Sequence, residues 1–355
     1  MGAICPLFDN LFQKEEVSAP TMTSAEDEEL RALVESLRIK ISIIGCGGGG
    51  SNTVRRMHQG GVEDVKLIAA NTDARHLLSI QAHHKILMGR NMTKGLGSGS
   101  LPEIGQRAAE ESENDLWQYV DGQNIVFIVA GMGGGTGTGA APIVADLAKR
   151  AGALTIGVVT LPFKAEGTVR MANAIKGLER LKEKCDTTIV LQNDRLLELV
   201  PKLPLEAAFR VTDEVLMQSI RGITDALTKP GLVNIDFNDL LAIMRNGGMA
   251  LIGLGESSEY GQRAEECIKE ALSSPMLGDV DVKQAKGALV RVVGGEDLTV
   301  TEAEKSALLV SEAVDPRARI IWGCAVDPNM KGDMRVLVVL TGVMFKSIVD
   351  SVKGK

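Results

Sequence analysis

Apolar residues fall in short runs along the first half of the chain, separated by polar and glycine-rich turns. Runs such as IKISIIG, NIVFIVAG and LTIGVVTLP show no alternation of apolar and polar positions. Such runs are typical of parallel strands covered on both faces. Helical patterns follow several of them, so this part of the chain predicts a doubly wound α/β fold with a mostly parallel sheet.

A long helix comes next, and after it the order of predicted strands and helices changes. Residues 205–227 carry a helical pattern, which Pro230 and Gly231 end. Beyond it, the alternation predicts a second α+β domain with its own sheet. Its expected strands read MALIGLGE, ALVRVVGG, IIWGCAVD and MRVLVVLTGV, with helices over 263–273 and 301–313. The predicted organisation is an N-terminal arm at 1–28, a first domain at 29–203, a central helix at 204–228 and a second domain at 229–355.

The N-terminal arm differs from the rest of the chain. Ile4, Phe8, Leu11 and Phe12 lie at helical spacing, so the arm is either disordered or a short amphipathic segment that docks on a partner or a membrane surface. The segment TSAEDEELRALVESLRIK then predicts a helix that begins with a capping box. No apolar run reaches the ~18 residues of a membrane span.

Composition narrows the possible functions. The net charge of −7 gives no overall positive field that would attract nucleic acid. The five cysteines are odd in number and never at zinc-site spacing, which predicts reduced thiols in a cytoplasmic protein. We expect no metal centre, and we interpret the four histidines as structural or surface groups.

The first glycine-rich segment, ISIIGCGGGGSNTVRRM, joins a predicted strand to a helix expected from about Asn52. Gly45, Gly47 and Gly50 match the dinucleotide fingerprint, and Asp73 lies about where such a fold binds ribose. A nicotinamide-dependent oxidoreductase is therefore one possible interpretation. Cys46 is expected to be a small packed residue, although a thiol here could react with alkylating agents and be protected by a bound ligand.

The second glycine-rich segment, AGMGGGTGTGAAP at 130–142, also follows a strand and opens a helix. Backbone N–H groups in such a turn favour phosphate, and Thr136 and Thr138 add hydroxyl groups. Pro142 is expected in the first helical turn. No lysine of a Walker loop follows. A nicotinamide enzyme does not need a second phosphate-binding turn, so this segment favours another nucleotide.

Several motifs in a fixed order resemble the tubulin/FtsZ superfamily in its FtsZ form. They are GCGGGGSNTV, AANTDA, TKGLGSGSLPEIG, GGGTGTGAAP, TLPFKAEGTVRMANA, NDRLL, KPGLVNIDFNDL and SSPML, within residues 39–345. The helix before the first strand is similar to that of archaeal members. The resemblance implies GTPases that polymerise head to tail into protofilaments of the cell-division ring, with a GTP-binding first domain and a GTPase-activating second domain.

The resemblance also implies a binding site for GTP or GDP, with Mg²⁺ held through phosphates and water. The residues placed near the phosphates and sugar are Gly48, Gly49, Gly50, Ser51, Asn52, Gly99, Ser100, Gly134, Gly135, Thr136, Gly137 and Thr138. Those assigned to the ribose and base are Thr160, Glu166, Arg170, Asn193, Phe209 and Asp213. Phe209 would stack on guanine, and Asp213 would accept hydrogen bonds from its N1 and N2. From the residues alone, Glu166 and Arg170 are an ordinary ion pair and Phe209 is a core residue.

Asn234, Asp236 and Asp239 form a second group, in NIDFNDLLAIM. From the residues alone, Asp236 is a helix N-cap with Asp239 three residues later. The resemblance implies that this loop enters the neighbouring subunit's nucleotide site. There the carboxylates would polarise the water that attacks the γ-phosphate. Both interpretations are compatible.

The resemblance implies a cytoplasmic protein at the division site. Its partners would be other copies of itself, a membrane anchor and other division proteins, and no nucleic acid. Where the family often has Ala-Gly-Gly/Ala-Asn, this chain has SGSL, so the loop over the γ-phosphate differs in detail. A non-hydrolysing structural filament protein of the same fold therefore remains an alternative beside the oxidoreductase, although both aspartates are present.

Overall fold

The structure is a computed structural model that describes residues 38–199, 204–259, 261–277 and 280–343. The chain divides into two units, Met1–Arg38 and Ile39–Lys355, and nearly all described residues belong to the second. The predicted arm at 1–28 lies outside the described residues, as does nearly all of the helix expected after it.

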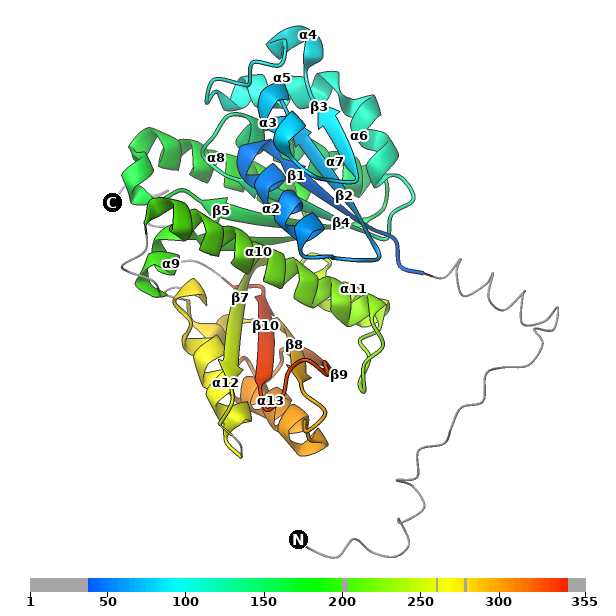
Figure 1. Cartoon of the computed structure of the whole chain (residues 1–355), viewed down its shortest axis with the longest axis vertical. Helices are drawn as coiled ribbons and strands as arrows, with labels where there is room; N and C mark the ends of the chain where they lie inside the picture. Colours follow the sequence, from blue (N-terminus) through cyan, green and yellow to red (C-terminus); the bar gives the residue numbers. More distant parts are fainter. Residues whose placement is uncertain (1–37, 200–203, 260, 278–279, 344–355) are drawn as a thin grey trace, which may run out of the picture. The chain divides into compact units, whose positions relative to one another are not determined.

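The described residues form a ten-stranded sheet with the strand order β3-β2-β1-β4-β5-β6-β7-β10-β8-β9 (Figure 1). The strands from β3 to β6 are all parallel, as the apolar runs predicted. Their bounds are β1 Ile41–Cys46, β2 Val65–Asn71, β3 His84–Leu87, β4 Ile125–Gly131, β5 Leu154–Leu161 and β6 Thr187–Gln192. The short strand β3 was not predicted.

The strands of the second half continue this sheet. Their bounds are β7 Gly248–Ser257, β8 Gly287–Gly294, β9 Arg319–Val326 and β10 Met334–Thr341. The expectation of a separate sheet is wrong, because β7 pairs with β6 over Thr187–Ile189 and Gly248–Ala250. β6 would otherwise be an edge strand with unpaired backbone groups, and the three-residue pairing covers part of that edge. β10 is antiparallel to both β7 and β8.

Helices cover both faces of the sheet. In the first half they are α2 Gly47–Gln59, α3 Ala74–Ser79, α4 Arg90–Thr93, α5 Pro102–Glu111, α6 Glu113–Val120, α7 Thr136–Arg150, α8 Thr168–Lys184 and α9 Asn193–Leu199. In the second they are α10 Leu205–Thr228, α11 Phe237–Met244, α12 Arg263–Ser273 and α13 Val300–Ala313. Short 3₁₀ turns lie at Lys164–Glu166, Pro275–Leu277 and Val282–Gln284.

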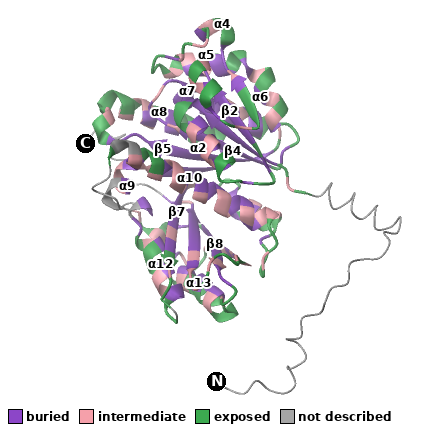
Figure 2. Ribbon diagram, in the orientation of Figure 1, coloured by how far each residue is buried: buried purple, intermediate pink, exposed green. Residues whose placement is uncertain are grey.

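The central strands are buried on both faces, which explains why their sequences do not alternate (Figure 2). In β1, Ile41 and Ile43 join the core under α2, α10 and α11. Ile44 and Cys46 join the core under α5, α7 and α8 on the other face. Successive side chains of a strand point to opposite faces, so one apolar run supplies both cores.

Two details of the glycine-rich segments differ from expectation. α2 begins at Gly47 instead of about Asn52, so most of the expected loop is the first turn of the helix. Pro142 lies in the second turn of α7, because that helix already begins at Thr136. Both helices therefore start almost directly after their strands. The long helix predicted over 205–227 is confirmed as α10.

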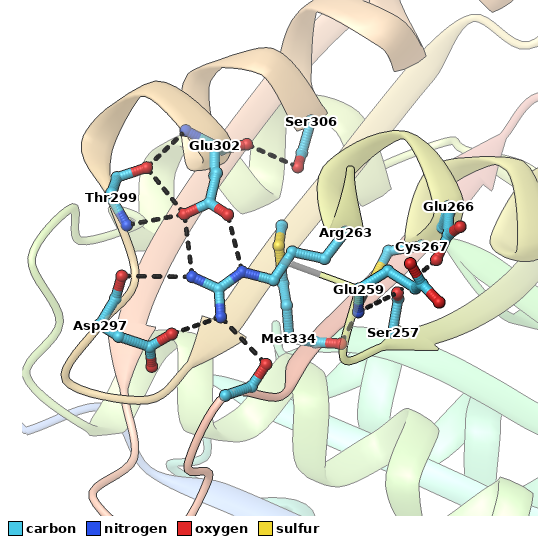
Figure 3. Close-up of polar contacts among 11 residues, drawn as sticks. Ser257, Glu259, Arg263, Glu266, Cys267, Asp297, Thr299, Glu302, Ser306 and Met334 are labelled. Carbon is cyan, nitrogen blue, oxygen red and sulfur yellow. Dashed lines mark hydrogen bonds and ion pairs between the residues drawn. The ribbon is translucent and has the colours of Figure 1, made fainter. Parts of the chain in front are cut away.

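A buried arginine joins three segments of the second half (Figure 3). The Arg263 side chain at the start of α12 has no exposed surface, and its Nε and Nη2 lie 2.7 and 3.0 Å from the carboxylate oxygens of Glu302. It also donates to Asp297 and to the carbonyl of Gly332. This pairing lowers the pKa of Glu302 from 4.5 to about 2. The resulting stabilisation is present above pH 4.5 and is lost as the pH falls towards 2.

We predict that Arg263→Met lowers the free energy of unfolding by about 3 kcal/mol, because the Glu302 carboxylate is left without its main partner. Denaturant unfolding at neutral pH measures the loss. Arg317→Met is the matched control, because that guanidinium is exposed and its ion pair among the described residues is with Asp315, two residues away. Equal stability of Arg263→Met and the wild type would contradict the assignment.

Candidate functional site

A cavity of about 600 Å³ lies where the carboxyl ends of the parallel strands meet. Residues that follow β1, β2, β4, β5 and β6 all reach its wall, and the start of α10 contributes the remaining side. Ligands of doubly wound sheets bind at this edge, and the volume suits a small-molecule ligand. The two glycine-rich segments, which lie far apart in sequence, thus face one space.

In the first glycine-rich segment, different glycines have different roles. Gly47 has a positive φ of 72°, and a Cβ there would lie 2.7 Å from the backbone nitrogen of Gly137 in the other segment. A Cβ on Gly50 would lie 2.2 Å from the carbonyl oxygen of Val129 in β4. By contrast, a Cβ on Gly48 would meet nothing within 4 Å, and Gly48 lines the cavity. Gly47 and Gly50 are therefore needed for close backbone packing against Gly137 and Val129, whereas the backbone of Gly48 is open to a ligand.

The second glycine-rich segment shows the same division. Gly134 lines the cavity and a Cβ there would meet nothing, whereas one on Gly135 would lie 2.3 Å from Ser98 Oγ. The hydroxyl of Thr136 lies 2.6 Å from that of Thr72 and 2.9 Å from that of Ser98. These hydrogen bonds hold the segments after β2 and before α5 against the start of α7.

Aromatic and amide groups also line the cavity. The Phe209 ring on α10 is 40% exposed and contacts the edge of Phe163 at 5.1 Å. Phe209 is thus not a core residue and is available for stacking on a flat ligand. The Asn193 Oδ1 atom is buried without a hydrogen-bond partner among the described residues, although Asn193 lines the cavity. Such an unpaired buried acceptor fits a site that a polar ligand completes.

Asp213 lies one helical turn after Phe209 on the same wall. Its carboxylate accepts from Arg56 Nε at 3.1 Å and from Thr53 Oγ1 at 3.4 Å, both on α2. Burial raises the pKa of the Asp213 carboxyl above its usual value, and the contact with Arg56 opposes the rise. Asp213 is therefore an acceptor that α2 holds in place on the cavity wall.

Most of the predicted nucleotide-binding residues line the cavity. They are Gly48, Gly49, Asn52, Ser100, Gly134, Gly135, Thr136, Gly137, Thr160, Glu166, Arg170, Asn193, Phe209 and Asp213. Four predicted residues, Gly50, Ser51, Gly99 and Thr138, do not reach the wall. The Thr138 hydroxyl instead accepts from the Gly133 N–H at 2.8 Å and shapes the turn. Arg170 Nε and Glu166 Oε2 form the expected ion pair at 3.1 Å.

Three residues around the end of β2 line the cavity although they were not among the nucleotide-binding residues that the resemblance implies. They are Asn71, Asp73 and His76, and Ser98 lines the cavity from the loop before α5, which the resemblance places over the γ-phosphate. Asp73 was considered only as a ribose ligand of a dinucleotide-binding fold, and both Asn71 and Asp73 are also typical turn residues. Both do stabilise the turn, since Asp73 caps α3 through the N–H of His76 at 3.0 Å. Their position directly after a buried parallel strand was the signal that could have found them.

The residues Asn234, Asp236 and Asp239 are exposed and do not line this cavity. Asp236 caps α11 by accepting from the Asn238 N–H at 3.2 Å, so its predicted N-cap role is confirmed. Asn234 Oδ1 accepts from the Gly231 N–H at 2.7 Å and holds the preceding turn. The buried side chains of Ile235 and Leu240 anchor this exposed loop to the core.

Two family models together match most of the chain. The model described as "Tubulin/FtsZ family, GTPase domain" matches residues 40–201, and "FtsZ family, C-terminal domain" matches residues 248–344. The cell division protein FtsZ of Haloferax mediterranei is 53% identical over 323 residues, which cover 91% of this chain and 84% of that protein. The chain belongs to the tubulin/FtsZ family.

Other FtsZ proteins are similar to this chain in sequence and in structure. The cell division protein FtsZ 1 of Archaeoglobus fulgidus is 52% identical over 331 residues, which cover 93% of this chain and 89% of that protein. A solved structure described as an empty FtsZ dimer of M. jannaschii is 49% identical, with a TM-score of 0.85. The match covers 90% of this chain and 93% of that one. The predicted fold class is thus confirmed.

Membership of a GTPase family removes the case for a nicotinamide oxidoreductase. It also implies binding of GTP and GDP. The open backbones of Gly48 and Gly134 fit phosphate groups. Among the described residues, no group of three or more His, Cys, Asp or Glu could hold a metal ion. None of the described helices is long and apolar enough to cross a membrane.

We predict that two glycine substitutions affect different properties, one the affinity for GTP and the other the stability of the fold. Gly134→Ala should keep the fold but lower GTP affinity at least 10-fold, because its methyl group projects into the phosphate end of the cavity. Gly50→Ala should lower the melting temperature, because its methyl group overlaps the Val129 carbonyl. Thermal unfolding and GTP titration separate the two effects. Unchanged GTP binding by a folded Gly134→Ala would contradict the placement of the phosphates.

Cys46 is completely buried, and burial raises its pKa to about 12. We therefore predict that iodoacetamide at pH 8 leaves Cys46 unmodified in the folded protein, both with and without GTP. Peptide mass spectrometry measures the modification, with the denatured protein as the positive control. Labelling of Cys46 that GTP prevents would instead support the reactive thiol considered in the sequence analysis.

Proposed function

We propose that this protein is a GTP-hydrolysing filament protein of cell division whose active site is completed by a neighbouring subunit. The observation that carries the proposal is the arrangement of the cavity. Open glycine backbones follow the central strands β1 and β4, and Phe209 and Asp213 line the wall from α10. This is the layout required for a nucleotide with a charged phosphate chain and a flat base.

In the proposed complex, the base stacks on Phe209 and donates from N1 and N2 to the Asp213 carboxylate. Guanine presents two donors on that edge, and a carboxylate accepts both. Thr160, Glu166, Arg170 and Asn193 contact the ribose and the base edge. The phosphates lie against the turns at Gly48 and Gly134. Mg²⁺ would be held through the phosphates and water and would neutralise charge on the phosphates.

The Asp236 loop lies too far along the chain's long helix to serve its own cavity. Asp213 and the last residue of α10, Thr228, are 15 residues apart and therefore about 22 Å apart along the helix axis. Asp236 caps the next helix, α11, which lies at the opposite end of α10 from α9 (Figure 1). Exposed Asn234, Asp236 and Asp239 are available to a second molecule.

A head-to-tail contact between copies would bring this loop over the next subunit's phosphates. Such a contact is heterologous and does not close, so it produces a filament. The solved M. jannaschii relative is described as a dimer, which supports self-association. The carboxylates of Asp236 and Asp239 would orient and polarise the attacking water, with Asn234 holding the loop. Phosphoryl transfer depends mainly on such positioning and on charge stabilisation.

The proposal assigns GTP binding to 29–203, a central connecting helix to 204–228 and GTPase activation to 229–355. It places the protein in the cytoplasm at the division site. Other copies of the chain, a membrane anchor and other division proteins are its partners. The names of its relatives as cell division proteins support this role.

We predict that Asp236→Asn and Asp239→Asn each lower GTP turnover at least about 100-fold and leave GTP affinity unchanged. Asparagine also caps helices well, so Asp236→Asn removes the charge and keeps the N-cap of α11. Asp281→Asn is the matched control, because Asp281 caps a short 3₁₀ turn at Val282–Gln284. Lost GTP binding, or full turnover in both variants, would contradict the catalytic assignment.

We predict that Asp213→Asn weakens GTP binding about 100-fold and improves binding of xanthosine triphosphate. Asparagine offers one acceptor and one donor, which suits the N1–H and O2 of xanthine. In the wild type, GTP affinity should fall as the pH is lowered through the raised pKa of Asp213, and this dependence should vanish in the variant. An unchanged preference for GTP over xanthosine triphosphate in the variant would show that Asp213 does not hydrogen-bond to the base.

A further inference from the structure

His76 occupies the cavity wall, where the sequence analysis expected only a structural or surface histidine. It lies in the first turn of α3, directly after β2, and it lines the cavity together with Gly97, Ser98 and Ser100. The backbone N–H of Ala74 donates to Gly95 at 3.0 Å, and that of Gly97 donates to Thr72 at 3.1 Å. These bonds hold the loop before α5 against the segment that carries His76.

The hydrogen bonds of Asn71 determine which nitrogen of His76 carries its proton. Asn71 Oδ1 accepts from the backbone N–H of Thr72 at 2.8 Å, and a backbone N–H can only donate. The other side-chain atom of Asn71 is therefore the nitrogen, which lies 3.1 Å from His76 Nδ1. Since the amide nitrogen donates, Nδ1 is the acceptor. The proton of the neutral imidazole is therefore on Nε2, which makes no hydrogen bond to any other described residue.

The strand order gives the end of the nucleotide that His76 meets. The base-binding residues belong to α10 and to the segments after β5 and β6. The open glycines follow β1 and β4 in the middle of the sheet, and His76 follows β2 on the far side. A nucleotide that runs from the base end across the glycine turns thus directs its terminal phosphate towards β2.

We propose that His76 binds the terminal phosphate of a nucleoside triphosphate by donating from Nε2, and so favours the triphosphate over the diphosphate. This inference rests on the proposed function. Ser98 in the divergent SGSL segment already hydrogen-bonds to Thr136 at 2.9 Å. The imidazole on α3 is therefore a side-chain donor beside this loop that is not already bonded to Thr136.

The test compares the affinities of GTPγS and GDP for dilute protein at a fixed Mg²⁺ concentration. His76→Ala should lower GTPγS affinity about 10-fold and leave GDP affinity unchanged, because only the triphosphate reaches the imidazole. His76→Gln should restore most of the preference, since the glutamine amide nitrogen is a donor at a similar distance from the backbone. His58→Gln, whose ring contacts His83 outside the cavity, is the matched control.

Each outcome has a distinct meaning. An equal loss of GTPγS and GDP affinity, or an unchanged ratio, would overturn the assignment, because His76 would then act only on the shape of the pocket. Failure of His76→Gln to restore the ratio would overturn the donor role of Nε2. Absence of GTPγS and GDP binding in the wild type would instead contradict the proposed function itself.

Discussion

The starts of α2 and α7 pack closely against the ends of β1 and β4. Only glycine allows the backbones to come so close. A Cβ on Gly50 would overlap the Val129 carbonyl, and one on Gly137 would lie 2.7 Å from the Gly131 carbonyl oxygen. One on Gly47 would lie 2.7 Å from the Gly137 nitrogen, so the two turns also pack on each other. This close packing brings the starts of α2 and α7 to the same cavity. The phosphate end of the site depends on it.

The long helix α10 extends the consequences of this packing across the molecule. Its first half carries Phe209 and Asp213 on the cavity wall, and α2 fixes Asp213 through Arg56. Its other end leads to the exposed loop with Asp236 and Asp239. We therefore propose that α10 links the state of the bound nucleotide to the loop that we assign to the next subunit. The length of this helix is the reason why we assign the loop to a neighbouring site.

Apolar runs predicted the parallel sheet, and a helical pattern before Pro230 and Gly231 predicted α10. The glycine-rich turns indicated two segments that do line one cavity, whereas the residues assigned to the base came from the family resemblance and not from a local pattern. The pairing of β7 with β6 was not predictable, because three paired residues leave no mark on the apolar pattern. The early start of α2 was missed because consecutive glycines suggest a loop, whereas here packing against β1 and β4 holds them in a helix. His76 was missed because a lone histidine carries no pattern. Only the strand order and the contact with Asn71 show its place.

The central claim is that hydrolysis requires two subunits, and GTP turnover per subunit across a wide range of protein concentration tests it most directly. With Mg²⁺ present, the account predicts negligible turnover in dilute protein and a sharp rise above a threshold, where light scattering also rises. Turnover per subunit that is constant from the most dilute sample upward would contradict it. Catalysis would then be complete within one chain, and the Asp236 loop would have no part in a neighbour's site.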